Sequence, residues 1–152
     1  MNKRLQALKL HQMDAHLKKI READFPARPT SGWARAVRDA LGMSGAALAK
    51  RLGMTTAGAR KLEEAEAREV ISIASLRKLA EALDCELKYA LVPRKPLDQI
   101  LKDRAQVIAT KRLSPVSNSM ALEDQSVRGT DRQLQIDLLA QELLDGSRRE
   151  LW

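Results

Sequence analysis

A chain of 152 residues is long enough for one core with appendages, and its composition limits what that core can be. Hydrophobic residues make up 44% and aromatic residues only 3%, so aliphatic side chains must fill the interior, which favours helices. No apolar run is long enough to span a bilayer and the N-terminus is too polar for a signal peptide, so we expect a cytoplasmic protein. The single cysteine, Cys85, excludes an intrachain disulfide, and no cluster of ligands or catalytic groups indicates a metal, a cofactor or an enzyme.

The net charge of +7 is unevenly distributed along the chain. Residues 1–112 carry 23 basic and 13 acidic side chains, whereas residues 113–152 carry four basic and seven acidic ones. A basic body with an acidic tail favours a polyanionic partner for the body, such as nucleic acid.

The first 42 residues predict two helices separated by a proline-containing segment. Residues 3–22 form an amphipathic helix, because apolar side chains recur every three or four positions. Thr30 or Ser31 caps a second helix, which Gly42 stops. The apolar positions are Leu10, Met13, Leu17 and Ile20 in the first helix and Trp33, Val37 and Leu41 in the second.

Three shorter helices follow, and each begins at a hydroxyl residue that suits an N-cap. Ser44 caps the third helix, which ends at Gly53, where a positive φ is tolerated. Thr55 caps the fourth helix, which runs to about Ala65, and Ser72 caps the fifth. The residues expected to face inward from the third and fifth helices are Ala47, Leu48, Leu52, Leu76, Leu79, Ala80 and Leu83.

The segment CELKYALV, residues 85–92, changes from a helical to a two-residue repeat. Apolar and polar side chains alternate along it, which is typical of a β-strand. No other segment of the chain predicts a partner strand, and an unpaired edge is a liability. We therefore expect this strand to pair with its counterpart in a second copy, which makes the protein a homodimer.

The C-terminal third predicts two further helices around a linker. Apolar positions repeat at helical spacing over residues 97–108 and again over roughly 131–145, and residues 113–130 form a linker with one short ordered piece. The expected organisation is an N-terminal helix and linker (1–29), a helical domain with its terminal strand (30–92), and a C-terminal helical extension that can bind a partner (93–152).

Residues 48–67, LAKRLGMTTAGARKLEEAEA, have the pattern of two short helices joined by a tight turn. Leu48 and Leu52 supply the packing face of the first helix, Ala49 allows close approach, and Gly53 makes the turn. Together with Ala59 and Leu62 they fit a helix-turn-helix, in which the second helix enters the major groove of DNA.

Residues from about Trp33 to Leu91 resemble the Cro/repressor-type (XRE) helix-turn-helix domain, through the runs SGAALAKRLGMTTAGARKLE and SIASLRKLAEALD. The fold class is therefore expected to be mainly α: a five-helix Cro/repressor-type helix-turn-helix domain with N- and C-terminal helical extensions and one short dimer-pairing β-strand. The resemblance implies that the protein binds a double-stranded DNA operator.

Carried over from that resemblance, the base-facing positions lie at the start of the fourth helix. A threonine hydroxyl can bond a base edge, methyl groups can touch thymine, and a long cation can reach guanine or phosphate. At position 45, where many relatives have a phosphate-binding glutamine, glycine leaves only the backbone amides of that helix start. Gly58 costs helix propensity, and we expect it to let the backbone approach DNA. The expected DNA-binding residues are Ser44, Lys50, Arg51, Thr55, Thr56, Ala57, Gly58, Arg60 and Lys61, with Arg35 and Arg38 as further phosphate contacts.

More of the chain resembles a narrower family, mobile mystery protein A, in the N-terminal helix, the strand ending in LVP, the SMALEDQ piece and the terminal LW. Such proteins are typically encoded beside a Fic/Doc-domain protein, so the resemblance implies an antitoxin paired with a Fic enzyme. Antitoxins of Fic enzymes carry an inhibitory helix in which Ser or Thr is followed, four positions on, by Glu. Ser119 and Glu123 match that spacing, although Asp124 replaces the usual Gly or Asn.

Two other functions are compatible with the same residues. One is a phage-like repressor whose outer helices only dimerise and that has no toxin partner. The other is an adaptor that binds an enzyme without binding DNA. A specific complex with the upstream DNA excludes the adaptor, and a stable complex with the adjacent gene product excludes the lone repressor.

Overall fold

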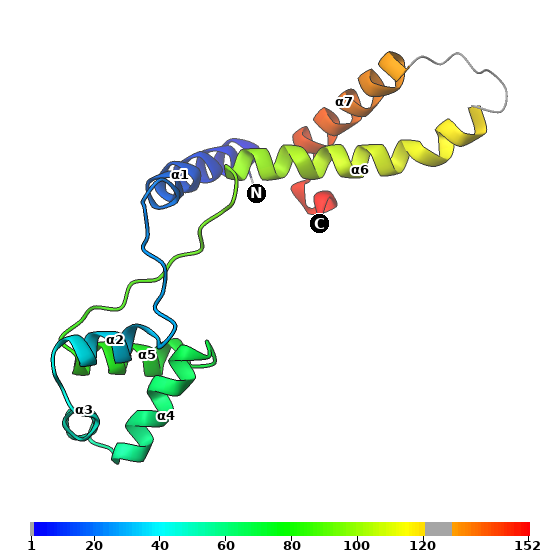
Figure 1. The fold of residues 1–152 in the computed structure, drawn as a ribbon. Helices are drawn as coiled ribbons and strands as arrows, with labels where there is room; N and C mark the ends of the chain where they lie inside the picture. Colours follow the sequence, from blue (N-terminus) through cyan, green and yellow to red (C-terminus); the bar gives the residue numbers. More distant parts are fainter. Residues whose placement is uncertain (1, 121–128) are drawn as a thin grey trace. The chain divides into compact units, whose positions relative to one another are not determined.

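The computed structural model describes residues 2–120 and 129–152, apart from the side chains of residues 115–120 (Figure 1). The chain forms two compact units. The central unit comprises Asp24–Ala90, and the terminal unit comprises Met1–Ala23 together with Leu91–Trp152. No helix in the described ranges is both long enough and apolar enough to cross a membrane.

The central unit consists of four helices around a small aliphatic core. They are α2 (Trp33–Ala40), α3 (Gly45–Leu52), α4 (Thr56–Ala67) and α5 (Ile73–Ala82), and α4 contacts the other three (Figure 1). The side chains of Leu48 and Leu79 are completely buried between these helices. The core cluster is Ala34, Leu48, Leu79 and Leu83, with Val37, Met43, Leu52, Leu62, Ile71 and Ala82 packed against it.

The predicted caps of α3, α4 and α5 are confirmed. The hydroxyls of Ser44, Thr55 and Ser72 each accept a hydrogen bond from the backbone N–H three residues on, at 3.1 Å in all three helices. Each bond satisfies one of the N–H groups that a helix start leaves without a partner.

The predicted cap of α2 is wrong. The N-cap residue is Gly32, with φ of +83°, and neither Thr30 nor Ser31 caps the helix. A carboxylate from α4 takes that role instead, as described below, so the start of α2 depends on a residue distant in sequence.

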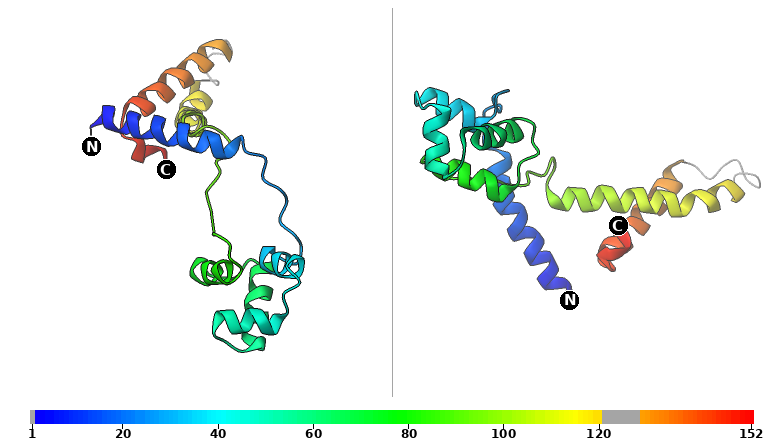
Figure 2. Two further views of the ribbon diagram at one scale, coloured as in Figure 1. Left: turned by 90° about the vertical axis from the view of Figure 1, so that its left-hand side faces the viewer. Right: turned by 90° about the horizontal axis from the view of Figure 1, so that it is seen from below.

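The terminal unit is built on two helices that pack along each other. They are α6 (Leu97–Met120) and α7 (Gly129–Asp145), with a 3-10 turn η1 (Arg148–Leu151) and α1 (Lys3–Arg21) added to them (Figure 2). Asp14 of α1 accepts a hydrogen bond from the backbone N–H of Leu97 at 2.9 Å, which joins α1 to the start of α6. The core residues of this unit are Ala105, Ala109, Ile136, Ala140, Leu143 and Leu151.

The structure confirms the helices predicted for residues 3–22 and 131–145 but extends the one predicted for 97–108. α6 continues to Met120, into the segment predicted as a linker. Leu113 packs against the core of the terminal unit, so the buried face of α6 reaches beyond the predicted end. Glu123 lies outside the described residues and the side chain of Ser119 is not described, so the predicted inhibitory pair has no structural account.

The strand predicted for residues 85–92 is not found in the single chain. These residues form neither strand nor helix, and no β-ladder occurs in the ranges that the structure describes. A strand is defined by hydrogen bonds to a neighbouring strand, and the chain supplies no such neighbour here. Cys85 is exposed, in contrast to the inward position that the alternation predicted.

Candidate nucleic-acid interface

A tight turn between α3 and α4 sets the angle at which α4 leaves the core. Gly53 ends α3 in the left-handed conformation, with φ of +67°, which glycine adopts without steric cost. The Met54 N–H then donates to the Ala49 carbonyl at 3.0 Å, and Ala49 itself is 3% exposed. The small side chain of Ala49 and the turn at Gly53 let the two helices approach closely, as predicted.

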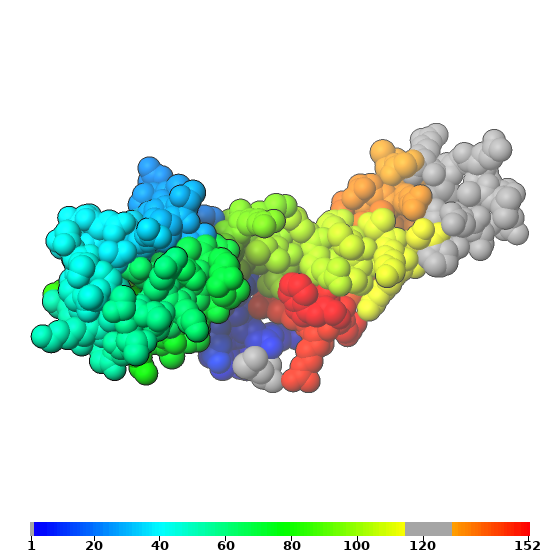
Figure 3. Space-filling model, turned by 60° about the horizontal axis from the view of Figure 1, so that its bottom comes forward, coloured from blue at the N-terminus to red at the C-terminus, as the bar shows by residue number. Residues whose placement is uncertain are grey.

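The beginning of α4 is exposed, and the other side of the helix packs on the core. Thr55, Thr56 and Ala57 are exposed, as are the two cations one turn further on, Arg60 and Lys61. Ala59 and Leu62 take the opposite side: Ala59 is buried and Leu62 packs against the core cluster. The residues predicted to face bases therefore lie together on the exposed side of α4. The helices of the central unit form the cyan-to-green part of the surface in Figure 3.

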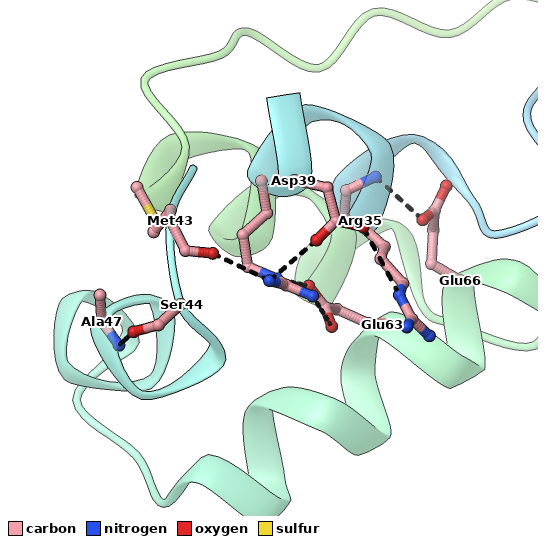
Figure 4. Close-up of polar contacts among 9 residues, drawn as sticks. Arg35, Asp39, Met43, Ser44, Ala47, Glu63 and Glu66 are labelled. Carbon is pink, nitrogen blue, oxygen red and sulfur yellow. Dashed lines mark hydrogen bonds and ion pairs between the residues drawn. The ribbon is translucent and has the colours of Figure 1, made fainter. Parts of the chain in front are cut away.

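A buried ion pair fixes the middle of α4 to the end of α2. The Arg38 Nε donates to Glu63 Oε1 at 2.6 Å, and one Nη donates to the Met43 carbonyl at 2.9 Å (Figure 4). The two charged side chains are 13% and 9% exposed, so solvent screens this pair little. The hydrogen bond to Glu63 raises the pKa of the Arg38 guanidinium, opposed by partial burial and assisted by the charges of Glu63 and Asp39. The contacts of Arg38 therefore hold α4 against α2.

A second buried carboxylate fixes the far end of α4 to the start of α2. Glu66 accepts hydrogen bonds from the backbone N–H groups of Trp33 at 2.8 Å and Ala34 at 3.1 Å. Its negative charge also lies at the positive end of the α2 dipole. A Cβ at Gly32 would lie 2.1 Å from Glu66 Oε2, so glycine is required there for space as well as for its positive φ.

A hollow of about 350 Å³ opens between α2, α3 and α4 beside this exposed surface. Gly45 lies at the start of α3 and Thr56 at the start of α4, so two helix N-termini border the hollow. Helix N-termini and arginine side chains both attract phosphate oxygens. The hollow is lined by Arg35, Arg38, Gly45, Leu48, Thr56, Ala59, Arg60 and Glu63.

The predicted phosphate-binding cations differ in how firmly they are engaged. Arg38 is held internally, and Arg51 pairs with Asp84 at 2.8 Å on the surface. Arg60 pairs with Glu64 at 2.9 Å, but its side chain is 80% exposed, so this pair is weak and open to exchange. Lys50 and Lys61 are exposed and form no ion pair within the described part of the chain. Arg35 has a long contact of 3.8 Å with Asp39.

The crowding at Gly58 comes from its own helix start. A Cβ at this position would lie 3.2 Å from the Thr55 hydroxyl and 3.4 Å from the sulfur of Met54. The Gly58 N–H donates to that same hydroxyl. The packing of the N-cap thus accounts for a glycine here, independently of the approach to DNA expected from sequence.

Sequence reasoning missed Gly32 and Glu66 and gave Glu63 no contact. On a helix, residues 63 and 66 lie one turn apart on one face, the face that also carries Ala59 and Leu62. Two acidic residues on the inward face of a helix whose outward face carries cations indicate internal ion pairing or hydrogen bonding of the carboxylates. Their partners, however, lie 25 to 33 positions away in the sequence.

The exposed surface lies in a part of the chain that matches a known protein family. Residues 35–89, about a third of the chain, match a family described as Helix-turn-helix, and α3 and α4 lie within the match. The match confirms the predicted helix-turn-helix and supports a DNA-binding transcriptional regulator of the Cro/repressor type. Comparisons with curated proteins and with solved structures gave no match.

Proposed function

We propose that the protein is a sequence-specific regulator that binds an operator as a homodimer, controls its own expression and neutralises a Fic/Doc-domain toxin. The observation that carries the DNA-binding part is the exposed start of α4, with Arg60 and Lys61 one turn behind Thr56. Two internal carboxylates hold the opposite side of α4 on α2, so this surface is presented outward. The Fic/Doc part rests on the resemblance of the chain to mobile mystery protein A.

In this proposal, one part of the exposed surface contacts bases and another part contacts phosphates. Thr56 and Ala57 offer a hydroxyl and two methyl groups to base edges, which suits contacts to thymine methyls and adenine or guanine acceptors. Lys61, Lys50 and the start of α3 beside Ser44 contact phosphates, which position the protein without reading sequence. Arg60 exchanges its weak pair with Glu64 for guanine or phosphate. Few side chains therefore contact bases, and phosphate contacts supply most of the affinity for DNA.

A homodimer places two copies of α4 about 34–36 Å apart, one turn of DNA, on a palindromic site. The operator is then expected in the DNA upstream of the gene, with two half-sites at that spacing.

The DNA-binding proposal is tested by fluorescence anisotropy with the upstream duplex and a shuffled duplex at several salt concentrations. Lys61→Ala is expected to lower the affinity and to reduce the slope of log affinity against log salt by about 0.9, the contribution of one phosphate contact. Lys111→Ala removes another exposed cation, from the terminal unit, and is the matched control. Equal affinity for both duplexes, or equal effects of the two variants, would contradict the proposal.

The toxin-binding proposal places contact with the enzyme in the C-terminal extension, residues 93–152, and inhibition at Ser119 and Glu123. Glu123 would pair with the enzyme arginine that otherwise binds the ATP γ-phosphate. Co-expression with the adjacent Fic/Doc-domain protein is expected to give a stable complex of low activity. Glu123→Ala should restore activity without dissociating the complex, and Asp124→Ala is the control. A complex that stays inhibited with Glu123→Ala would refute the role of this residue.

A further inference from the structure

In the part of the chain that the structure describes, the backbone of residues 86–89 has no backbone hydrogen-bond partner. From Glu86 to Val92, no backbone N–H donates to a backbone carbonyl in the part of the chain that the structure describes. Within the segment Leu87 is half-buried, whereas its neighbours Glu86 and Lys88 have side chains that are 77% and 82% exposed. Tyr89 is also 69% exposed.

An apolar groove of about 300 Å³ lies beside this segment. Its walls come from α2, α5 and the segment itself, and Leu87 is one of the lining residues. Cys85, Glu86, Leu87 and Lys88 of the segment border the groove, and the side chains of Glu86 and Lys88 are largely exposed to solvent. The apolar side chains that line the groove are Trp33, Ala34, Val37, Leu76, Ala80, Leu83 and Leu87.

We propose that a second copy of the chain covers this edge by adding its own residues 85–89 as an antiparallel strand, with the two-fold axis at Leu87. In that register Glu86 lies opposite Lys88 of the partner subunit, and Lys88 lies opposite Glu86 of the partner subunit. Opposite charges in directly facing positions stabilise antiparallel strands. The inference rests on the proposed homodimer and specifies how its two copies meet.

Neighbouring registers are disfavoured by charge and by side-chain alternation. An axis at Lys88 places two lysines opposite each other, and an axis at Glu86 places two glutamates opposite each other, both repulsive. If the two-fold axis falls between two residues, each charged residue faces an apolar residue of the other copy. Charged and apolar side chains then no longer lie on separate faces of the paired strands. Of these registers, only the axis at Leu87 places complementary charges opposite each other and keeps Glu86 and Lys88 on the face of the pair opposite to Leu87.

Disulfide trapping tests the register directly. In a Cys85→Ser background, Leu87→Cys is expected to form an intersubunit disulfide on mild oxidation, because the two residues face each other at the axis. Lys88→Cys in the same background is the matched control and should stay unlinked. Because Leu87 is half-buried, a second variant avoids any loss of packing: Tyr89→Cys with the native Cys85 should link the two positions across the pair.

A charge swap tests the same register in solution. Glu86→Lys should weaken dimerisation about tenfold by sedimentation velocity, since each of two facing pairs becomes repulsive. Adding Lys88→Glu should restore the dimer, because the swapped charges again face each other. Failure of the double variant to recover would overturn the proposed register.

The outcomes separate this inference from the proposed function. If Lys88→Cys links and Leu87→Cys does not, the register is wrong, although the homodimer stands. If the parent chain is a monomer at micromolar concentration, both the pairing and the homodimer fail. Operator binding is measured separately by anisotropy, so a monomer that still distinguishes the operator from a shuffled duplex leaves the DNA-binding function intact.

Discussion

The central and terminal units hold their helices together by different kinds of contact. In the terminal unit, α6 and α7 meet through small and aliphatic side chains, with Ala105 and Ala109 of α6 completely buried. In the central unit, α4 is joined to both ends of α2 by the carboxylates of Glu63 and Glu66 in addition to its apolar contacts. Apolar contacts are non-directional, whereas hydrogen bonds require defined distances and angles.

The difference indicates what each helix pair has to achieve. A helix that presents one surface to a duplex needs a fixed rotation and a fixed axial position, because its side chains have to match the groove. Glu63 and Glu66, one turn apart, supply two directional anchors for α4. Between α6 and α7 the core contacts are apolar and non-directional, and small apolar residues suffice for them.

The largest expected effects come from truncating a fully buried leucine in either unit. Leu48 and Leu151 both have an exposed fraction of 0%, and each leucine-to-alanine change should lower the free energy of unfolding by about 2–5 kcal/mol. Urea unfolding followed by tryptophan fluorescence separates the units, because Trp33 lies in one and Trp152 in the other.

The single-tryptophan variants Trp33→Phe and Trp152→Phe make each signal report on one unit. Leu48→Ala should shift the transition seen by Trp33, and Leu151→Ala the one seen by Trp152. If either change moved both transitions equally, the two units would unfold as one cooperative body and the comparison would lose its basis.

The next effect concerns the anchor between Gly32 and Glu66. Gly32→Ala should cost about 1–2 kcal/mol for the positive φ, and about 1–3 kcal/mol more because the new Cβ displaces Glu66 from two backbone N–H groups. Gly42→Ala is the matched control, because Gly42 also has a positive φ but no atom within 4 Å of the added Cβ. The quantity to compare is the difference between the two changes in unfolding free energy; equal losses would mean that the Glu66 cap contributes nothing.

The features predicted correctly from sequence are those with local causes. The caps at Ser44, Thr55 and Ser72 bond to N–H groups only three residues away, so a short stretch of sequence contains both partners. The same holds for the turn at Gly53, whose positive φ follows from the residue type and its place after α3. The exposed start of α4 follows from these two features together.

The features that sequence reasoning missed depend on a second, distant segment. Glu66 looks like one more charged residue until α2 is placed beside α4, and the cap of α2 was therefore assigned to Thr30 or Ser31. The alternation in residues 85–92 is visible in the sequence, but a strand also needs a neighbour, and the described part of the chain contains none there. Periodicity identifies which side of a segment is apolar, and it carries no information about which segment packs on that side.

A smaller effect is expected at Gly58, on the exposed side of α4. Gly58→Ala gains up to about 1 kcal/mol of helix propensity, but its Cβ meets the Thr55 hydroxyl at 3.2 Å, so the net gain should be well below that value. Ala57→Gly, at the neighbouring exposed position, should lower the free energy of unfolding by nearly the full difference in helix propensity between alanine and glycine. Thermal unfolding of the two variants measures both, and a full gain from Gly58→Ala would show that the N-cap tolerates the added carbon.

The smallest expected effect lies in the terminal unit, where a polar contact joins α6 to α7 through Asp137. The side-chain amides of Gln106 and then Gln133 donate to its carboxylate at 2.9 Å, and these hydrogen bonds lower the pKa of Asp137 below its usual value. A lowered pKa in the folded state means that the stabilisation is complete above the unfolded value of about 3.9 and is lost as pH falls from there through the folded pKa. In Asp137→Asn, the free energy of unfolding should therefore fall less steeply as the pH is lowered, as measured in the variant in which Trp152 is the single tryptophan. Gln106→Leu should reduce that steepness in part, because Gln133 still donates, and an unchanged acid profile in both variants would mean that apolar packing alone holds α6 and α7.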